Sequence, residues 1–330
     1  MNAVRIIRFL LTVAVLVAPA SAQSIVSARS GALHHVEGTA LMDGERVIME
    51  FAKFPSLAEG SVLETAEGRA EMLLTPGATI RLAEDSSVKM LSNRLTDTQL
   101  EFQDGSALVE AVEMLEGNGI TVRFRETAVT IEKAGLYRFD SDPAQFRVYK
   151  GKAIVVKGAE RIVAKKGSLV EMGAFLVAGK FNPKQDDSLY RWSARRSSYL
   201  ASANMAAANS MSFWGMPWRQ SGWFWNPYFG MMTYIPAGGM YRSPFGYRYF
   251  SPFAAAAYFA PRPRMSSGWG GGFNPNRGYT VVGSRSASTA GRSSGGVSAS
   301  GSAGAASSSP TSRGGGGAVG RGGTAGGRGR

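Results

Sequence analysis

The stretch ITVRFRETAVTIEKAGLYRFD, residues 120–140, decides the fold class of this chain. Ile120, Val122 and Phe124 point to one side of an extended backbone, and the residues between them are polar and point to the other side. The alternation resumes twice more before Asp140, so one face of each segment is apolar and the other polar. The stretch therefore predicts three consecutive short β-strands, each with one buried and one solvated face.

The same pattern extends outward on both sides, from about His35 to Gly173. Turn dipeptides such as Asp43-Gly44 and Lys150-Gly151 divide it into short segments. No long helical pattern interrupts these segments, which argues against βαβ units. We expect an all-β domain of about twelve short strands, either a β-sandwich or a short β-solenoid. A stretch of about 140 residues is long enough to bury such a core.

The first 22 residues have the three parts of a secretory signal peptide. Arg5 and Arg8 precede the apolar run FLLTVAVLVA, and Ala20-Ser21-Ala22 is an A-x-A cleavage pattern. The apolar run is too short for a bilayer, which needs about 20 such residues. We therefore expect cleavage after Ala22, no transmembrane helix in the mature chain, and export to the periplasm, the cell surface or the medium.

The net charge of +13 is distributed unevenly. Residues 188–330 hold fifteen arginines and no Lys, Asp or Glu, whereas residues 1–187 hold 22 basic and all 24 acidic residues. This asymmetry is typical of an interaction tail. The expected partner is an envelope protein or an anionic envelope surface or polysaccharide. Arg-Gly-Gly triplets near the end of the chain suggest nucleic acid as an alternative partner. This alternative is weaker, because an exported protein does not meet cytoplasmic RNA.

Residues 186–208 show the period of one amphipathic helix. Leu189, Trp192, Arg196, Tyr199 and Ala203 fall near one stripe of this helix. Asp186 and Asp187 stand where carboxylates cap a helix N-terminus. We expect a connector helix that lays Trp192 and Tyr199 on the β domain, and a partner-binding helix is the alternative.

Turn glycines and core positions in three segments, together with three positions in residues 135–139, resemble the FecR-like domain. The segments are LLTPGATIRLAEDSSVKML (73–91), LEFQDGSALVE (100–110) and FRVYKGKAIVV (146–156). The matching positions are Gly77, Ser87, Val88, Leu100, Gly105, Val109, Gly135, Tyr137, Phe139, Val148, Gly151, Ala153 and Val155. The resemblance covers residues 60–175, about a third of the chain. It implies a FecR-like β fold.

The best-known members of the FecR-like family are membrane-bound sigma-factor regulators with a periplasmic FecR-like part. Only eight residues precede Phe9 in this chain, so no cytoplasmic anti-sigma region is expected before the apolar segment. The resemblance therefore implies the exported, stand-alone type of bacterial FecR-domain protein.

The expected organisation has five parts. They are a signal peptide (1–22), a FecR-like β domain (23–180, core about 60–175), a connector helix (181–210), a segment rich in aromatic residues, Pro and Arg (211–264), and a low-complexity Gly/Ser/Arg-rich tail (265–330). The tail has too few apolar residues to offset its chain entropy, so we expect it to be disordered.

The stretch GWFWNPYFGMMTYIP, residues 222–236, carries six aromatic residues and no charge. Its prolines disfavour a regular helix or a central strand. The candidate binding residues are Trp223, Trp225, Tyr228, Phe229 and Tyr234. These side chains could stack on sugar rings or insert at a membrane interface. Alternatively, they fold back onto the β domain, and the sequence leaves both possibilities open.

No catalytic, cofactor-binding or metal site is expected. The chain has no cysteine, and its two histidines, His34 and His35, are adjacent, so on a strand they would face opposite sides. We interpret them as a surface or turn pair. No nucleophile elbow, Walker A loop or H-E-x-x-H motif is present.

The predicted function is therefore that of a non-enzymatic, exported cell-envelope binding or interaction module. One alternative is a regulatory or sensing component of an envelope signalling system, as for the membrane-bound FecR relatives. A second alternative is a surface adhesion protein that acts through its aromatic and arginine-rich tail.

Overall fold

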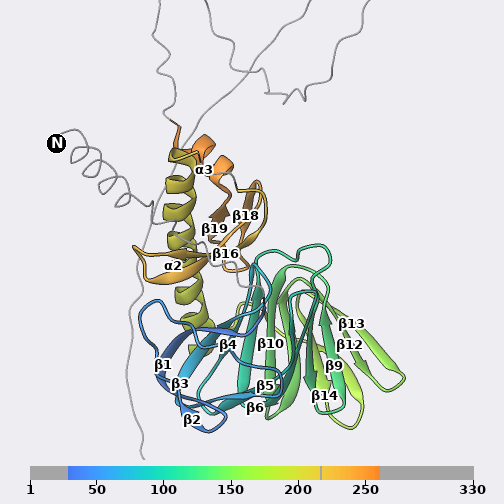
Figure 1. Ribbon diagram of the computed structural model, residues 1–330. Coiled ribbons are helices and arrows are strands. Elements are labelled where there is room, and N and C mark those ends of the chain that lie inside the picture. Colours follow the sequence, from blue (N-terminus) through green and yellow to red (C-terminus); the bar gives the residue numbers. More distant parts are fainter. Residues whose placement is uncertain (1–28, 216–217, 261–330) are drawn as a thin grey trace, which may run out of the picture. The chain divides into compact units, whose positions relative to one another are not determined.

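The computed structural model describes residues 29–215 and 218–260 (Figure 1). The predicted signal peptide with its cleavage site at Ala22, and the predicted tail of residues 265–330, lie outside the described residues. Most of the described chain is β-strand, with α2 and α3 as its helices, which confirms the all-β prediction. Neither helix combines the length and the apolar character that a bilayer-spanning segment needs.

Among the described residues, fifteen strands form one sheet. They are β1 (Ala32–Met42), β2 (Glu45–Arg46), β3 (Val62–Leu73), β4 (Ala78–Leu82), β5 (Ser86–Arg94), β6 (Asp97–Asp104), β7 (Ser106–Ala111), β8 (Ile120–Phe124), β9 (Thr127–Ile131), β10 (Gly135–Ser141), β11 (Ala144–Lys150), β12 (Lys152–Lys157), β13 (Glu160–Lys165), β14 (Ser168–Met172) and β15 (Leu176–Lys180). Their order is β13-β12-β9-β8-β6-β5-β3-β4-β7-β10-β11-β14-β15, and β1 joins at β3 and carries β2. Only the β6–β8 pair in this described sheet is parallel.

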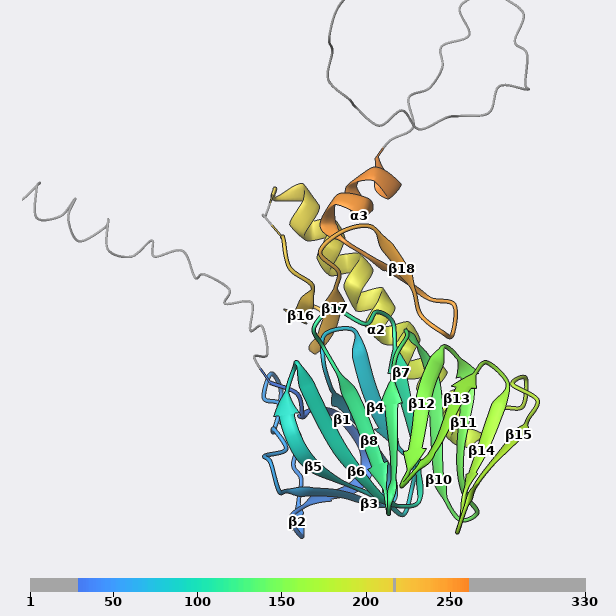
Figure 2. The same cartoon turned by 90° about the vertical axis from the view of Figure 1, so that its right-hand side faces the viewer.

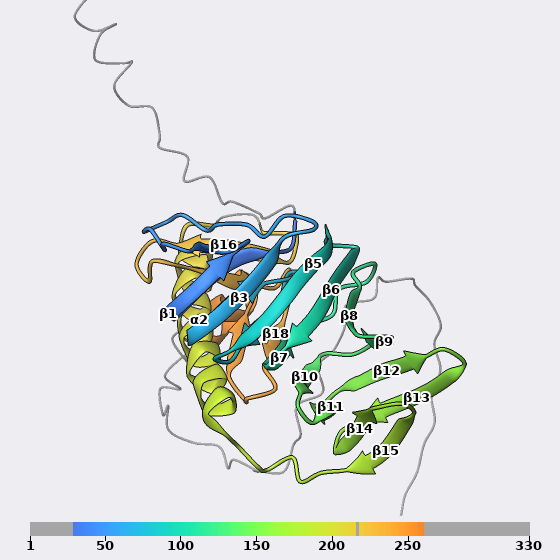
Figure 3. The ribbon, with the colours of Figure 1, turned by 90° about the horizontal axis from the view of Figure 1, so that it is seen from below.

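The sheet folds over on itself so that strands far apart in its order share one core. Phe102 of β6 and Phe124 of β8 have ring centroids 5.4 Å apart, and Phe102 lies 6.1 Å from Phe139 of β10. Four strands separate β6 from β10 in the sheet, so this contact requires two facing layers. Figure 3 shows the strands from β1 to β15 laid along a curve. Facing layers with antiparallel pairing are typical of a sandwich, whereas coils of a β-solenoid stack in parallel.

The stretch at residues 120–140 forms β8, β9 and β10, as predicted. Ile120, Val122 and Phe124 are all buried in the shared core. The prediction of a solvated face is wrong for β10, where every residue is buried. The second face of β10 is covered because Leu136 packs against Leu189 and Trp192 of the following helix.

That helix, α2 (Ser188–Phe213), runs across the sheet and continues beyond it (Figures 1 and 2). Asp187 caps its start by accepting a hydrogen bond from the backbone N–H of Tyr190 at 2.8 Å, as predicted. Trp192 is buried, but Tyr199 is 53% exposed, so its predicted place on the β domain is wrong. The buried stripe instead passes through Leu200, one position along.

Two hairpins and a short helix follow α2. They are β16 (Gly222–Asn226) with β17 (Met231–Ile235), β18 (Met240–Arg242) with β19 (Arg248–Phe250), and α3 (Pro252–Phe259). The prolines limit the first hairpin without preventing it, because β16 ends directly before Pro227 and β17 directly before Pro236. We call residues 188–215 and 218–260 the cover.

Hydrogen bonds over long sequence distances attach the cover to the sheet and hold its parts together. The indole Nε1 of Trp223 donates to the backbone oxygen of Leu74 at 3.2 Å. Asn204 of α2 donates to the backbone oxygens of Tyr234 and Phe250 and accepts from the N–H of Phe250, at 2.8, 3.0 and 2.7 Å. A buried backbone group without a partner is costly, so these bonds fix the hairpins on α2.

Candidate functional site

A cluster of charged side chains is buried between the sheet and α2. In the register of β3 and β4, Glu71 stands directly opposite Arg81. Arg81 Nε donates to Glu71 Oε2 and Arg81 Nη1 to Glu110 Oε2, each at 2.7 Å. Arg196 of α2 donates from Nη2 to Glu71 Oε1 at 2.8 Å. The side chains of Glu71 and Arg81 are 0% exposed, so a substrate cannot reach them.

His34 belongs to the same cluster because of a β-bulge. The register between β1 and β3 shifts between Leu33 and His35, which leaves His34 as the extra residue. Its Nε2 accepts a hydrogen bond from the backbone N–H of Met232 at 3.0 Å, so that nitrogen is unprotonated. Nδ1 therefore carries the proton and donates to Glu71 Oε1 at 2.8 Å. The interpretation as a surface or turn residue is wrong for His34, because the bulge turns it inward.

The pKa values in this cluster follow from burial and charge. Burial alone would raise the pKa of Glu71, but Arg196 and Arg81 outweigh it and hold that pKa well below its usual range. Burial lowers the pKa of His34, which agrees with a neutral imidazole. Burial and then Arg196 lower the pKa of His35, beside Trp192, to about 4. Two carboxylates and two guanidinium groups thus balance, and the cluster attaches α2 to the sheet.

Within residues 29–215 and 218–260, no group of three His, Asp or Glu side chains is placed to hold a metal ion. The acidic pairs of the chain have structural roles in a turn and at a helix cap. Glu84 and Asp85 form the turn before β5, with Asp85 at a φ of 48°, and Asp187 is the helix cap.

The structure separates the five candidate aromatic residues into two groups. Trp223 and Tyr234 are 2% and 1% exposed and pack edge to face, 6.0 Å apart, where the cover meets the sheet. Trp225 is half-buried, whereas Tyr228 and Phe229 are 88% and 45% exposed. Trp223 and Tyr234 therefore fold back onto the β domain, whereas the binding role stays a prediction for Trp225, Tyr228 and Phe229.

Trp225 forms one wall of an open cavity of about 300 Å³. The cavity is lined by Ala32, Ala52, Phe54, Ser56, Leu73, Trp225 and Met232. Phe51 and Phe54 meet the Trp225 ring at centroid distances of 5.6 and 5.5 Å, both edge to face. The lining is apolar apart from Ser56, which suits an apolar side chain.

The exposed aromatics beside this cavity are held by local geometry. Gly230 lies under the ring of Phe51, since a Cβ there would stand 2.9 Å from Phe51 Cε2. Asn226 Oδ1 accepts from the N–H of Tyr228 at 3.0 Å, and Asn226 Nδ2 donates to Ala203 O of α2 at 2.9 Å. We call Phe51, Phe54, Trp225, Tyr228 and Phe229 the aromatic surface.

Sequence reasoning missed Phe51 and Phe54. They come from the connection between β2 and β3, in the stretch VIMEFAKFP (47–55), which has no strict alternation. The Phe-x-x-Phe-Pro pattern is the one local signal that marks these rings as special. Their meeting with Trp225 depends on contacts between residues about 170 positions apart, which no local pattern encodes.

Comparisons with known proteins give no assignment. No family model matches the chain, and no curated protein matches it. Two crystal structures of a "putative anti-sigma factor" from Parabacteroides distasonis ATCC 8503 are similar to it. The first is 12% identical to this chain with a TM-score of 0.33, and the match covers 41% of this chain and 64% of that structure's chain. The second is 13% identical with a TM-score of 0.33, and the match covers 46% of this chain and 73% of that structure's chain. Likeness at this level assigns neither a family nor an activity.

Proposed function

We propose that this protein is a non-enzymatic binding module that captures an apolar side chain of a protein partner at the aromatic surface. The observation that carries the proposal is the open cavity of about 300 Å³ between Phe54, Trp225 and Met232. A fixed apolar cavity flanked by exposed rings is a common design for such recognition. A sugar is a poorer fit, because Ser56 supplies the one polar side chain among the lining residues, and sugar hydroxyls need several hydrogen-bond partners.

The non-enzymatic part of the proposal is supported by the position of the charged cluster. Glu71, Arg81 and His34 have the perturbed pKa values that often mark active sites, yet their side chains are sealed from solvent. Their hydrogen bonds to α2 and β17 account for them as attachment groups.

An exported location completes the proposal and depends on the signal peptide of residues 1–22. Fractionation of the cells that make this protein should find it in the periplasm, on the surface or in the medium. Recovery of the full-length chain, still carrying residues 1–22, from the cytoplasm would contradict this part.

The resemblance to the FecR-like domain favours a second candidate, a regulatory component of an envelope signalling system. In that case the captured side chain belongs to a signalling protein. Affinity capture of a sigma-factor regulator or an outer-membrane transporter would favour this candidate, provided that Phe51→Ser abolishes the capture.

The binding chemistry can be tested with a single methyl group. Met232 lines the cavity, so its ¹³C-labelled methyl reports on an occupant, and Met172 in the sheet core is a matched control. We expect N-acetyl-phenylalaninamide to shift the Met232 signal in a saturable way and to leave Met172 unchanged. A shift caused by an N-acetylglucosamine oligomer instead would replace the protein partner with a sugar, and no shift with either would overturn the proposed site.

A further inference from the structure

A second cluster of exposed aromatic side chains lies where α2 ends and α3 packs against it. Phe213 and Trp214 are 80% and 75% exposed, and Phe253 of α3 is 83% exposed. Tyr258 and Phe259 of α3 are also exposed. We call these five residues the tip, and none of them belongs to the aromatic surface.

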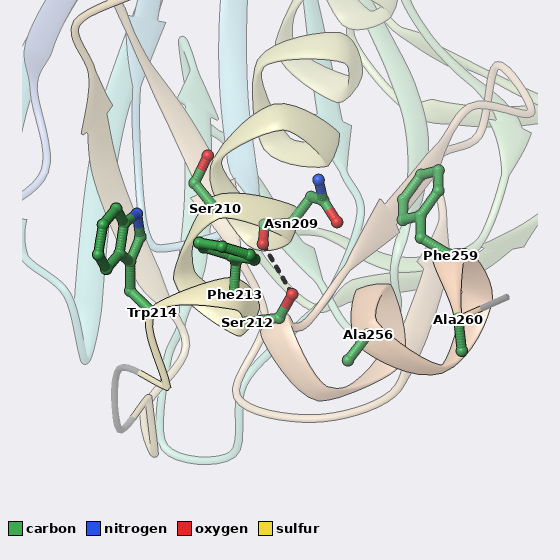
Figure 4. Close-up of a pocket in the computed structure, with 8 residues that line it drawn as sticks. All are labelled: Asn209, Ser210, Ser212, Phe213, Trp214, Ala256, Phe259 and Ala260. Carbon is green, nitrogen blue, oxygen red and sulfur yellow. Dashed lines mark hydrogen bonds between the residues drawn. The ribbon is translucent and has the colours of Figure 1, made fainter.

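The tip has a defined shape. A shallow groove of about 440 Å³ separates the end of α2 from α3, with Phe213 and Trp214 on one side and Phe259 on the other (Figure 4). The rings support one another, with centroids 5.4 Å apart for Phe213 and Trp214 and 5.1 Å apart for Tyr258 and Phe259. Because the backbone that carries these rings is helical or caps a helix, they are presented from a fixed scaffold.

The composition of α3 makes the exposure unusual. Its sequence PFAAAAYF contains no charged residue, and a helix that is apolar all round is normally buried. Here only Pro252 and Ala255 are buried, and Phe253 is 83% exposed. Tyr258 and Phe259 contact Phe250 on one side but remain 57% and 44% exposed. Contiguous exposed apolar side chains of this kind mark a contact surface.

The charge of the surrounding chain indicates what that contact is. No Asp or Glu occurs anywhere from Ser188 to the end, and Arg262 and Arg264 follow α3 directly in the sequence. Trp and Tyr prefer the headgroup level of a bilayer, and arginines bind anionic headgroups while their stems cover apolar surface. A protein groove is a poorer match, because an eight-residue helix without a polar face does not have the amphipathic pattern of groove-binding helices.

We propose that the tip docks the protein on an anionic lipid bilayer, with Trp214, Phe253 and Tyr258 inserted at headgroup level. Exposed arginines of the cover, such as Arg242 and Arg248 on the hairpin before α3, attract the anionic lipid, and the aromatic rings insert among the headgroups. This docking is peripheral, and it leaves the aromatic surface on other elements free for a protein partner.

The test uses the full mature chain and sedimentation with vesicles of phosphatidylcholine, alone or mixed equally with phosphatidylglycerol. We expect binding to the anionic vesicles and little to the neutral ones. The double variant Trp214→Ser with Phe253→Ser should bind about tenfold or more weakly, since it removes two large apolar groups from the interface. Phe175→Ser is the matched control, because Phe175 is 71% exposed but lies between β14 and β15, and its affinity should not change.

Insertion is distinguished from charge attraction by a second readout. Brominated acyl chains should quench tryptophan fluorescence of the original chain more than that of Trp214→Phe. Binding that salt abolishes and that the tip variant leaves unchanged would overturn the proposal, since the arginines alone would then account for it. Absence of binding, equal binding to neutral vesicles, or tip-dependent self-association without vesicles would also overturn it. Unaltered thermal melting of the variants ensures that the comparison is between folded chains.

Discussion

Replacing Glu71 by Gln isolates the charge of the buried cluster, because the two side chains have nearly the same shape. Glu71 accepts from Arg81, Arg196 and His34, and its side chain is 0% exposed. In the native chain two carboxylates balance two guanidinium groups around a neutral His34. The variant leaves one buried guanidinium charge without compensation.

The cost follows from this imbalance. Removal of one partner from a buried ion pair destabilises a protein by about 3–5 kcal/mol. For a folded unit of this size, each kcal/mol lowers Tm by about 2–4 °C, so Glu71→Gln should lower Tm by about 6–20 °C. Differential scanning calorimetry and urea unfolding at pH 7 measure both quantities.

An exposed ion pair between β3 and the turn before β5 provides the control. Glu84 accepts from Arg69 at 3.0 Å, but its side chain is 57% exposed. Glu84→Gln should therefore change the free energy of unfolding by less than about 1 kcal/mol. If Glu71→Gln were as mild as Glu84→Gln, the cluster would be solvated and would not attach α2 to the sheet.

Three further predictions concern pH and backbone packing. The folded pKa of His35 is about 4 against an ordinary 6.5, and that of His34 is also lowered, so the unfolded chain binds protons first. The contribution of these histidines to the free energy of unfolding should be fully present above about pH 6.5 and be lost between about pH 6.5 and 4. For partly exposed His35 the loss is on the order of 1–2 kcal/mol, and His35→Asn should flatten this part of the curve in a urea series. Asn204→Ala leaves three buried backbone groups without partners and should cost about 2–4 kcal/mol by calorimetry. Ser198→Ala removes a half-buried hydroxyl that donates to the Arg195 oxygen and should cost less. Gly38→Ala would place a Cβ 2.2 Å from the oxygen of Glu67 at a φ of 81°, so it should lower Tm clearly, whereas Gly44→Ala meets no atom within 4 Å and should cost less.

Local patterns were sufficient to predict much of the sheet. Alternation placed Ile120, Val122 and Phe124 in the core, and a carboxylate before an amphipathic run placed the cap at Asp187. Both signals act over a few residues, so the sequence displays them directly.

The cover could not be predicted in the same way. Trp223 donates to Leu74, 149 residues away, and Trp192 Nε1 donates to Glu37 Oε2, 155 residues away. A tryptophan that will be buried by such a partner looks the same in the sequence as one that stays exposed. The bulge at His34 was equally hidden, since it depends on the register of β1 against β3.

Phe51 and Trp223 have different proposed roles, Phe51 in binding at the aromatic surface and Trp223 in packing the cover on the sheet. One binding measurement tests this difference most directly. The dissociation constant of N-acetyl-phenylalaninamide, followed at the Met232 methyl, should be compared in the original chain, Phe51→Ser and Trp223→Phe. We predict that Phe51→Ser weakens binding about fivefold or more, because it removes a ring beside the cavity. Trp223→Phe should lower Tm but change the constant much less, because Trp223 is buried and is not itself one of the residues that line the cavity. Equal constants for the original chain and Phe51→Ser would contradict the aromatic surface as the binding site.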